Sequence, residues 1–407
     1  MGKKISLNPF HIKKDLVEKA GEVVLEKAGD VVKGIPNAVK RTGKVLQPDI
    51  QVMMLGARRV GKTSILASMV NSFNDVTGET NLVLTKTNGG KAIDDALNSM
   101  KGYFQGNPQK YCIVENMDTN ATMGFDAFDL KLTIAGKKES IPRKIRFKDC
   151  AGEWISNYSN EDEIGEEVEK SDVIIIAIDS VLLMEENENP DGLGKFNSQN
   201  AVENVTNFVK SFMQPEDTIN NHKMVLFVPL KCEKYYWENE DKDSIYYDCG
   251  MKKLNEAVRR AYKDLIDFFQ KPNNKQYFDV AILPILTIGG IQFYEFTADK
   301  NATKVQSGEM EFEYCIPRGA DKPKFQPLNC EQPLIYALLF EYQKIQKDYM
   351  DKTFKADNRK KVTATIKEWI QDKKNITKDM DYIKEMEKLK AKRKTSDDGI
   401  EIIQGTF

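Results

Sequence analysis

The chain has only two histidines, His11 and His222, among its 407 residues. A histidine-rich metal site or a catalytic centre built around histidine is therefore not expected. The six cysteines include no C-x-x-C pair, which argues against a structural zinc site or a disulfide framework and is typical of reduced thiols in a cytosol. No apolar run approaches the roughly 20 residues that span a bilayer, and no secretory signal is visible.

The chain also lacks an excess of charge of either sign. Its formal net charge is −2, which gives no overall attraction to nucleic acid, so we expect no nucleic-acid partner. Charged residues make up 30% and apolar residues 41%, an ordinary composition for a soluble protein. The length allows one large domain or two smaller ones.

One stretch carries a specific chemical signal. Residues 56–63, GARRVGKT, fit the phosphate-binding pattern G-x-x-x-x-G-K-[ST] at every fixed position. A short apolar run before the stretch predicts a strand, and apolar residues at helical spacing after it predict a helix. In that context the N–H groups of the loop point at phosphate oxygens. We expect these residues to bind a nucleotide: Gly56, Arg58, Arg59, Val60, Gly61, Lys62, Thr63 and Ser64.

Two side chains of this loop have separate roles. Lys62 can reach the outer phosphates, and the Thr63 hydroxyl is placed to hold Mg²⁺. Arg58 and Arg59 sit inside the loop. Three roles stay open for them: a contribution to the transition state, a solvated surface charge, or a salt bridge to an acid of the domain. A helix start with glycines and a surface lysine is the alternative to a nucleotide site.

A second motif is Asp149-Cys150-Ala151-Gly152-Glu153, at the end of a predicted strand. A carboxylate at a strand tip can reach Mg²⁺ or its water shell, as the Walker-B aspartate does. The N–H of Gly152 can meet a γ-phosphate without steric hindrance. A simple turn is the alternative.

Strands and helices alternate along the rest of the domain. Residues 171–179, 224–229 and 280–285 predict buried strands separated by helices, and 125–134 with 144–148 predict a hairpin. This order predicts a three-layer α/β fold of the P-loop NTPase type, with a mostly parallel central sheet. Ligands of such sheets bind at the carboxyl ends of the strands, so the strand tips at Gly56, Asp149, Lys231 and Thr287 should meet there.

The chain divides into three predicted segments. Residues 1–47 predict an amphipathic, basic helix that packs on the main domain or on a partner, or lies on a membrane surface; its start also fits a myristoylation pattern. Residues 48–349 form the nucleotide-binding domain, and residues 350–407 a charged helical tail for interaction. The residues after about Thr395 are expected to be disordered.

Together, the motifs resemble the Ras-like (TRAFAC) class of P-loop GTPases. The D-x-A-G-E form of the second motif looks most like the bacterial double-GTPase group. The resemblance implies GTP or GDP and Mg²⁺ as cofactors. Thr122 lies in a segment similar to switch I and would bind Mg²⁺ together with Thr63 and Asp149; Thr119 is the fallback. Thr122, Gly152 and Glu153 would be the catalytic residues.

The base-binding residues also follow from the resemblance. Lys231 would lie along the guanine, Glu233 would accept its N1 and N2 hydrogens, and Thr287 and Ile288 would touch its O6 edge. The family motif N/T-K-x-D reads Leu-Lys-Cys-Glu here, so the acid is one methylene longer. An ATP-preferring enzyme therefore stays an alternative.

The implied function is a cytoplasmic, Mg²⁺-dependent GTPase that acts as a switch for a protein partner, bound through the N-terminal helix or the tail. A peripheral membrane contact belongs to the same hypothesis. Glu153 stands where the family has a water-positioning glutamine, and its charge would repel a γ-phosphate. We therefore expect slow intrinsic hydrolysis, and a nucleotide-binding scaffold with little turnover is the other alternative.

Overall fold

The computed structural model describes residues 49–58, 60–106, 111–112, 125–137, 143–157, 159–185, 200–213, 222–298, 310–317, 324–356, 381–396 and 399–405. Two compact units divide the chain: residues 1–47 with 343–382, and residues 48–342 with 383–407. Both sheets and both nucleotide motifs belong to the second unit.

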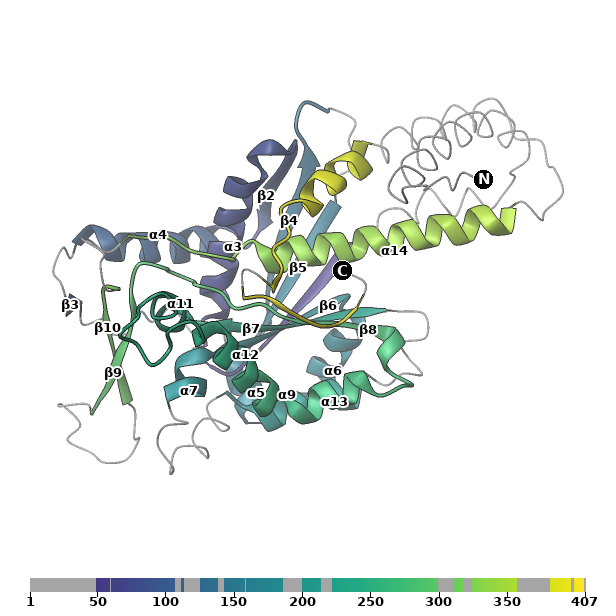
Figure 1. The fold of residues 1–407 in the computed structure, drawn as a ribbon. Coiled ribbons are helices and arrows are strands. Elements are labelled where there is room, and N and C mark those ends of the chain that lie inside the picture. The colour runs from purple at the N-terminus through teal and green to yellow at the C-terminus, as the bar shows by residue number, and fades with distance from the viewer. Residues whose placement is uncertain are drawn as a thin grey trace, which may run out of the picture. The chain divides into compact units, whose positions relative to one another are not determined.

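An eight-stranded sheet forms the centre of the second unit (Figure 1). Its order is β11-β8-β7-β6-β1-β5-β4-β2. The strands are β1 (Ile50–Leu55), β2 (Leu82–Asn88), β4 (Phe125–Ile134), β5 (Arg143–Cys150), β6 (Val173–Asp179), β7 (Lys223–Leu230), β8 (Phe278–Ile282) and β11 (Glu401–Gln404). The five strands from β8 to β5 run parallel, whereas β4, β2 and β11 pair antiparallel at the two sides.

Buried apolar residues explain the parallel centre. Every residue of β6 and β7 is buried, as expected for strands covered by helices on both faces. In β5, buried and half-buried residues alternate, because one of its faces is more open. The chain passes from β1 to β5 on one side and then crosses to β6 on the other, which makes the carboxyl end of β1 a switch point of the sheet.

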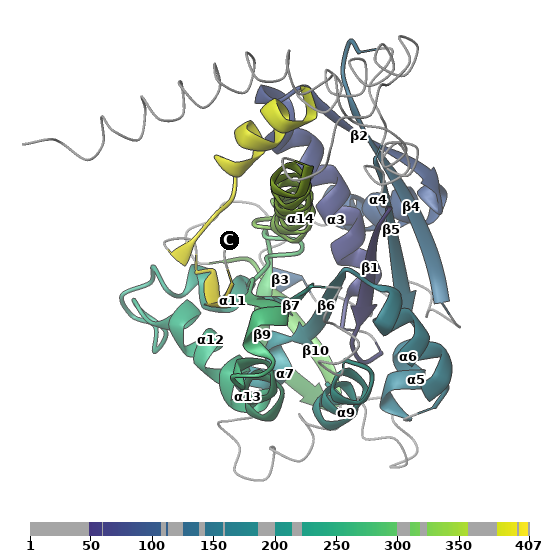
Figure 2. The same ribbon diagram turned by 90° about the vertical axis from the view of Figure 1, so that its right-hand side faces the viewer.

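Helices cover the two faces of this sheet. In Figures 1 and 2, α3 and the start of α14 lie on one face, and α6, α9, α12 and α13 lie on the other. The helices are α3 (Lys62–Val76), α4 (Gly90–Gly106), α5 (Gly152–Ser156), α6 (Glu161–Lys170), α7 (Ser180–Glu185), α9 (Val202–Phe212), α11 (Glu233–Trp237), α12 (Gly250–Ala261), α13 (Lys263–Gln270) and α14 (Gln332–Ala356), with short 3-10 turns η1 (Thr77–Glu79) and η3 (Lys275–Tyr277). Residues 381–390 are also helical. The architecture is the predicted three-layer α/β fold.

A second, three-stranded antiparallel sheet has the order β3-β10-β9. Its strands are β3 (Tyr111–Cys112), β9 (Gln292–Ala298) and β10 (Met310–Cys315). It lies on the side of α11 in Figure 1, and the ammonium group of Lys234 in α11 is 5.5 Å from the ring centroid of Phe293 in β9. The sheet therefore packs near the segment that follows β7.

The predicted hairpin is present as β4 and β5. Strand β2 was not predicted. Only Leu82 and Leu84 of its seven residues are buried, so this side strand has too few apolar residues to show a pattern.

The expectation of disorder after about Thr395 is wrong. Strand β11 pairs with β8, and the Gln404 amide donates to the carbonyl oxygens of Phe269 at 3.3 Å and Phe278 at 2.9 Å. Residues 383–407 fall in the compact unit of the sheet rather than in a separate tail. The predicted segment 1–47 lies outside the described residues.

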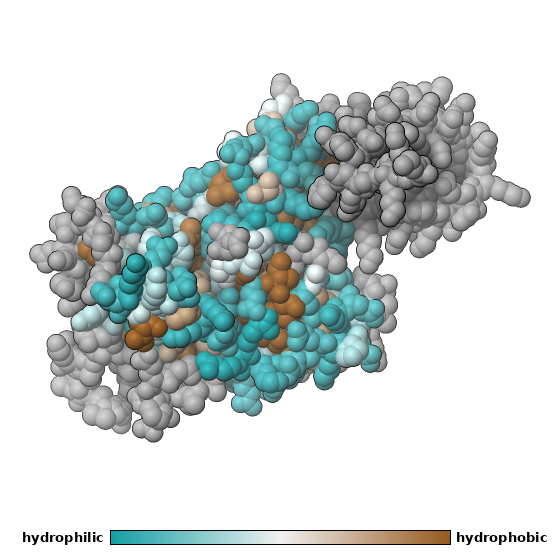
Figure 3. Space-filling model, in the orientation of Figure 1, coloured by the Kyte–Doolittle hydropathy of each residue, from teal (hydrophilic) through white to brown (hydrophobic). Residues whose placement is uncertain are grey.

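The described residues on the face drawn in Figure 3 are mainly hydrophilic. The face in Figure 3 shows a few separate hydrophobic areas on a hydrophilic background. The described large apolar side chains that are exposed are Val83 in β2, Ile245 and Tyr247 between α11 and α12, Tyr294 in β9 and Ile402 in β11. Among the described helices, none combines the length and the apolar character needed to cross a bilayer.

Candidate functional site

In the loop between β1 and α3, two glycines adopt backbone conformations that other residues rarely adopt. Gly56 has φ 151° and Gly61 has φ 107°, values in the region that favours glycine. A Cβ atom on Gly56 would lie 2.8 Å from the carbonyl oxygen of Ala177 in β6. The loop therefore packs directly against the neighbouring strand, where a side chain at position 56 has no room.

Lys62 begins α3 and folds back over the loop. Its ammonium group donates hydrogen bonds to the carbonyl oxygens of Gly56 at 3.0 Å and Ala57 at 3.1 Å, and its side chain is 7% exposed. No side-chain cap and no acidic residue occupies the first turn of α3. The N-terminal N–H groups and the lysine thus place positive charge at one point, which suits an anion.

Thr63 and Asp149 meet beside this lysine. The Thr63 hydroxyl donates to Asp149 Oδ2 at 3.3 Å, and Asp149 Oδ1 lies 3.9 Å from Lys62 Nζ. Strand register causes the meeting, because Met54 near the end of β1 pairs with Asp149 near the end of β5. Burial raises the pKa of Cys150 to about 12, so this neighbouring thiol stays protonated and is no nucleophile.

The second motif touches the loop through its glycine. A Cβ atom on Gly152 would lie 2.2 Å from the backbone nitrogen of Arg58, so the start of α5 and the loop are in backbone contact. One residue further, Glu153 Oε1 forms an ion pair with Arg58 Nη1 at 3.0 Å. Of the roles that the sequence left open for Arg58, the structure shows the salt bridge.

At the tip of β7, Lys231 pairs with Asp179 at the tip of β6. Lys231 has φ 59°, a left-handed conformation that is uncommon for a residue with a side chain. Burial opposes its charge, but the nearby acidic groups, Asp179 foremost, together raise the pKa of Lys231 above the usual value. Asp179 was not among the predicted site residues, although a carboxylate that ends a fully apolar strand is a signal that was available.

Glu233 binds the turn that follows β8. Its Oε1 accepts the N–H groups of Ile288 at 3.0 Å and Gly289 at 3.1 Å. Burial raises the pKa of Glu233, against the opposing effect of these two N–H groups. The structure therefore brings Lys231, Glu233 and Ile288 together, with one carboxylate oxygen of Glu233 engaged by backbone.

Thr287 is held between two other segments. Its carbonyl oxygen accepts from the Ser68 hydroxyl of α3 at 3.0 Å, and it is 6% exposed. On the far side, Gln326 N donates to Ile288 O at 2.8 Å. The turn is thus fixed by α3 and by residues 324–328, which places the predicted base-binding positions on a rigid support.

The structure gathers the other predicted loop residues as well. Val60 is buried, and Ser64 is half-buried in the first turn of α3. Arg59 and Thr122, with its fallback Thr119, lie outside the described residues. The strand-tip prediction holds for the described part of the chain, since β1, β5, β7 and the extension of β8 present Gly56, Asp149, Lys231 and Thr287 at the same edge.

A protein-family model matches the part of the chain that carries the phosphate-binding loop. The model of the family Double-GTPase 2 matches residues 50–224. This part of the chain is a P-loop GTPase domain of the double-GTPase group. The match covers the phosphate-binding loop and the second motif of the double-GTPase domain, and it supports a P-loop protein that binds guanine nucleotide.

No curated protein matches the chain. Solved structures similar to it include the GTPase-like domain of Ski7 from S. cerevisiae bound to GTP, with a TM-score of 0.33 and 12% identity over 61% of this chain and 45% of that chain. The same domain bound to GDP and inorganic phosphate gives a TM-score of 0.35 and 11% identity over 61% of this chain and 46% of that chain. This chain therefore matches less than half of the length of either, and the likeness is too slight to bear on function.

The residues of the double-GTPase domain fit a nucleotide with Mg²⁺. Among the described residues, no three His, Cys, Asp or Glu side chains form a ligand cluster. A Mg²⁺ ion in a nucleotide site needs few protein ligands, because it keeps waters and binds phosphate oxygens. The Thr63 hydroxyl and the Asp149 carboxylate are the two oxygens that would hold it.

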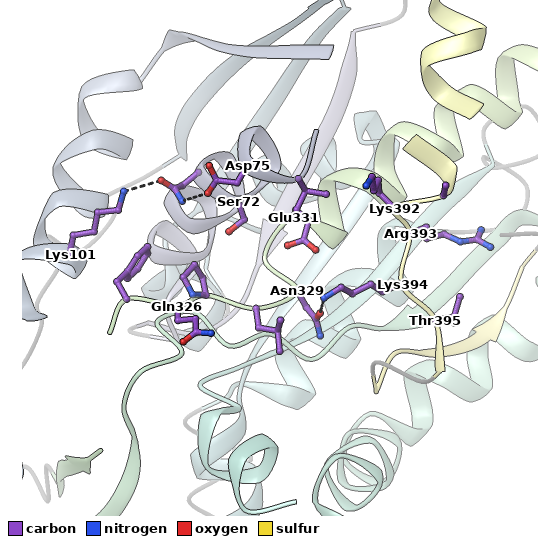
Figure 4. A pocket seen from close by; sticks show the side chains of 16 residues that line it. Ser72, Asp75, Lys101, Gln326, Asn329, Glu331, Lys392, Arg393, Lys394 and Thr395 are labelled. Carbon is purple, nitrogen blue, oxygen red and sulfur yellow. Dashed lines mark hydrogen bonds between the residues drawn. The ribbon is translucent and has the colours of Figure 1, made fainter. Parts of the chain in front are cut away.

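A groove of about 880 Å³ in the same unit lies elsewhere (Figure 4). It is lined by the second half of α3, by residues 325–331 and by residues 391–395. Asp75 and Lys392 come from its opposite walls. Because the phosphate-binding loop precedes the first turn of α3, this groove is separate from the nucleotide site.

Proposed function

We propose that the chain binds GTP with Mg²⁺, hydrolyses it slowly to GDP, and uses the nucleotide to control contact with a protein partner. The observation that carries this proposal is the convergence of Lys62, Thr63 and Asp149 under the glycine-bounded loop. It supplies positive charge, a hydroxyl and a carboxylate at one end of a helix dipole. These are the groups that phosphoryl-transfer sites of P-loop proteins require.

In this proposal, the loop N–H groups and Lys62 hold the β- and γ-phosphates. Mg²⁺, when bound, neutralises phosphate charge, and Thr63 and Asp149 would hold it. The Gly152 N–H faces the terminal phosphate. On the base side, the stem of Lys231 lies along the guanine, with Glu233 as the group that selects it.

Two observations define the rival functions. Oε1 of Glu233 already accepts two backbone N–H groups, which leaves less of the carboxylate for guanine and favours an ATP-preferring enzyme. The acid Glu153 in place of a glutamine favours a scaffold with little turnover. The switch partner, a cytoplasmic location and a peripheral membrane contact of residues 1–47 stay parts of the proposal.

One experiment separates these functions. GTP, GDP and ATP compete for the purified chain with and without Mg²⁺, and bound GTP is then followed in a single turnover. The proposal expects GTP and GDP to displace ATP, and GTP to be hydrolysed faster than free GTP in the same buffer. Preference for ATP contradicts the guanine assignment, and hydrolysis at the rate of free GTP supports the scaffold.

A further inference from the structure

Arg58 and Glu153 connect the phosphate-binding loop with the second motif. Their ion pair measures 3.0 Å, and both side chains are 48% exposed. Arg58 occupies a position that the loop pattern leaves variable. Glu153 follows directly after the glycine that faces the terminal phosphate. In the proposed function, this ion pair therefore lies beside the terminal phosphate of the nucleotide.

The backbone holds the two residues in place. The contact between Gly152 and Arg58 is so close that an added Cβ atom would lie 2.5 Å from Arg58 Cα. On the other side of the loop, Gly56 packs against Ala177. Arg58 and Glu153 thus lie at a close backbone contact, and their side chains form the ion pair beside it.

Glu153 creates an electrostatic problem for a bound triphosphate. Its carboxylate adds negative charge next to the site of the γ-phosphate, and like charges at short range repel. The Arg58 guanidinium supplies the compensating charge, since it engages Glu153 directly. A diphosphate does not reach this region, so the compensation acts on the triphosphate alone.

We propose that Arg58 is a positioning residue that neutralises Glu153 and thereby sets the preference of the site for a nucleoside triphosphate over the diphosphate. This inference rests on the proposed function. It differs from a role of Arg58 as a direct phosphate ligand. As a direct ligand, the guanidinium is required for triphosphate binding whatever residue stands at position 153. In the role proposed here, it is required only while Glu153 is charged.

A double-mutant cycle separates the two roles. Affinities for GTP and GDP are measured with Mg²⁺ for the wild type, Arg58→Ala, Glu153→Gln and the double variant. Arg58→Ala should lower the affinity for GTP by about three- to tenfold at low salt and leave the affinity for GDP unchanged. Glu153→Gln in the same chain should restore the ratio to within about twofold, because the repelling charge is gone.

Three controls sharpen the cycle. Arg58→Lys keeps the charge and should retain most of the wild-type ratio. Lys263→Ala removes an exposed ion pair with Asp267 in α13 and should leave both affinities unchanged. Helix α13 precedes the start of β8, at the opposite edge of the sheet from the nucleotide site. The effect of Arg58→Ala should shrink in 1 M salt, because exposed charges are screened.

The outcomes are distinct. A double variant that stays as weak for GTP as Arg58→Ala overturns the inference and makes Arg58 a direct phosphate ligand. An unchanged ratio in Arg58→Ala also overturns it, while the proposed function stands. If the wild type binds neither GTP nor GDP, the proposed function fails, and this inference fails with it.

Discussion

The Thr63 hydroxyl and the Asp149 carboxylate lie 3.3 Å apart, although 86 positions separate the two residues in the chain. Parallel pairing of β1 with β5 brings them together at the carboxyl edge of the sheet. The two motifs that the sequence offers separately therefore form one site, in which Lys62 lies within 4 Å of the same carboxylate.

Thr63→Ala should remove the Mg²⁺ dependence of GTP binding. With Mg²⁺ present, we expect GTP affinity to fall about tenfold or more, because one oxygen ligand and its hydrogen bond to Asp149 are lost. In EDTA the variant and the wild type should bind GTP alike. Thr85→Ala on exposed β2 is the matched control. Equal losses with and without Mg²⁺ would contradict the placement of the ion.

Glu233 should make stability depend on pH. Its pKa is raised by burial above the ordinary 4.5, so between pH 4.5 and the raised pKa the folded chain holds a proton that the unfolded chain has lost. The contribution is full below pH 4.5 and disappears as the pH rises through the raised pKa. In urea unfolding, Glu233→Gln should therefore gain stability relative to the wild type as the pH increases.

Glu163→Gln, exposed on α6, controls for the loss of one charge in that comparison. The glutamine at 233 keeps an oxygen for the N–H groups of Ile288 and Gly289, so the turn after β8 should survive. GTP affinity should fall in Glu233→Gln if the carboxylate reads guanine. A stability difference that stays constant with pH would show that Glu233 has the same pKa in the folded and the unfolded chain, which contradicts the raised pKa.

The end of the chain should contribute to the stability of the sheet. Ile400, which directly precedes β11, is 2% exposed, whereas Ile402 within β11 is 40% exposed. Ile400→Ala should lower the free energy of unfolding by about 2–4 kcal/mol. Ile402→Ala should change it by less than about 1 kcal/mol. Equal, small effects of both changes would mean that β11 does not pair with β8 in solution.

Local patterns predicted the parts of the site that depend on near neighbours in the chain. The glycines and lysine of residues 56–63 specify a strand, loop and helix by themselves, and Asp149 closes a strand that alternation reveals. The fully buried strands β6 and β7 were visible as continuous apolar runs. For these elements, the sequence contains the physical cause within about ten residues.

Contacts between distant segments could not be read in the same way. Two examples are the ion pair of Arg58 with Glu153 and the hydrogen bonds of Glu233 with the N–H groups of Ile288 and Gly289. Both contacts depend on strand register and on the geometry of turns, which the spacing of residues in the sequence does not encode. The polar residues of β2 and the short β11 gave no periodic signal. Both strands exist because the sheet offers them an unpaired neighbour.

The most direct test of the account is a calorimetric titration of GTP, with Mg²⁺, into the wild type and into Lys62→Ala. The wild type should bind GTP, and Lys62→Ala should lose about a hundredfold or more in affinity, because a buried cation leaves the phosphate site. Lys91→Ala, an exposed lysine of α4, should bind like the wild type. GTP binding of equal strength in Lys62→Ala would contradict the phosphate-binding site on which every other statement about function depends.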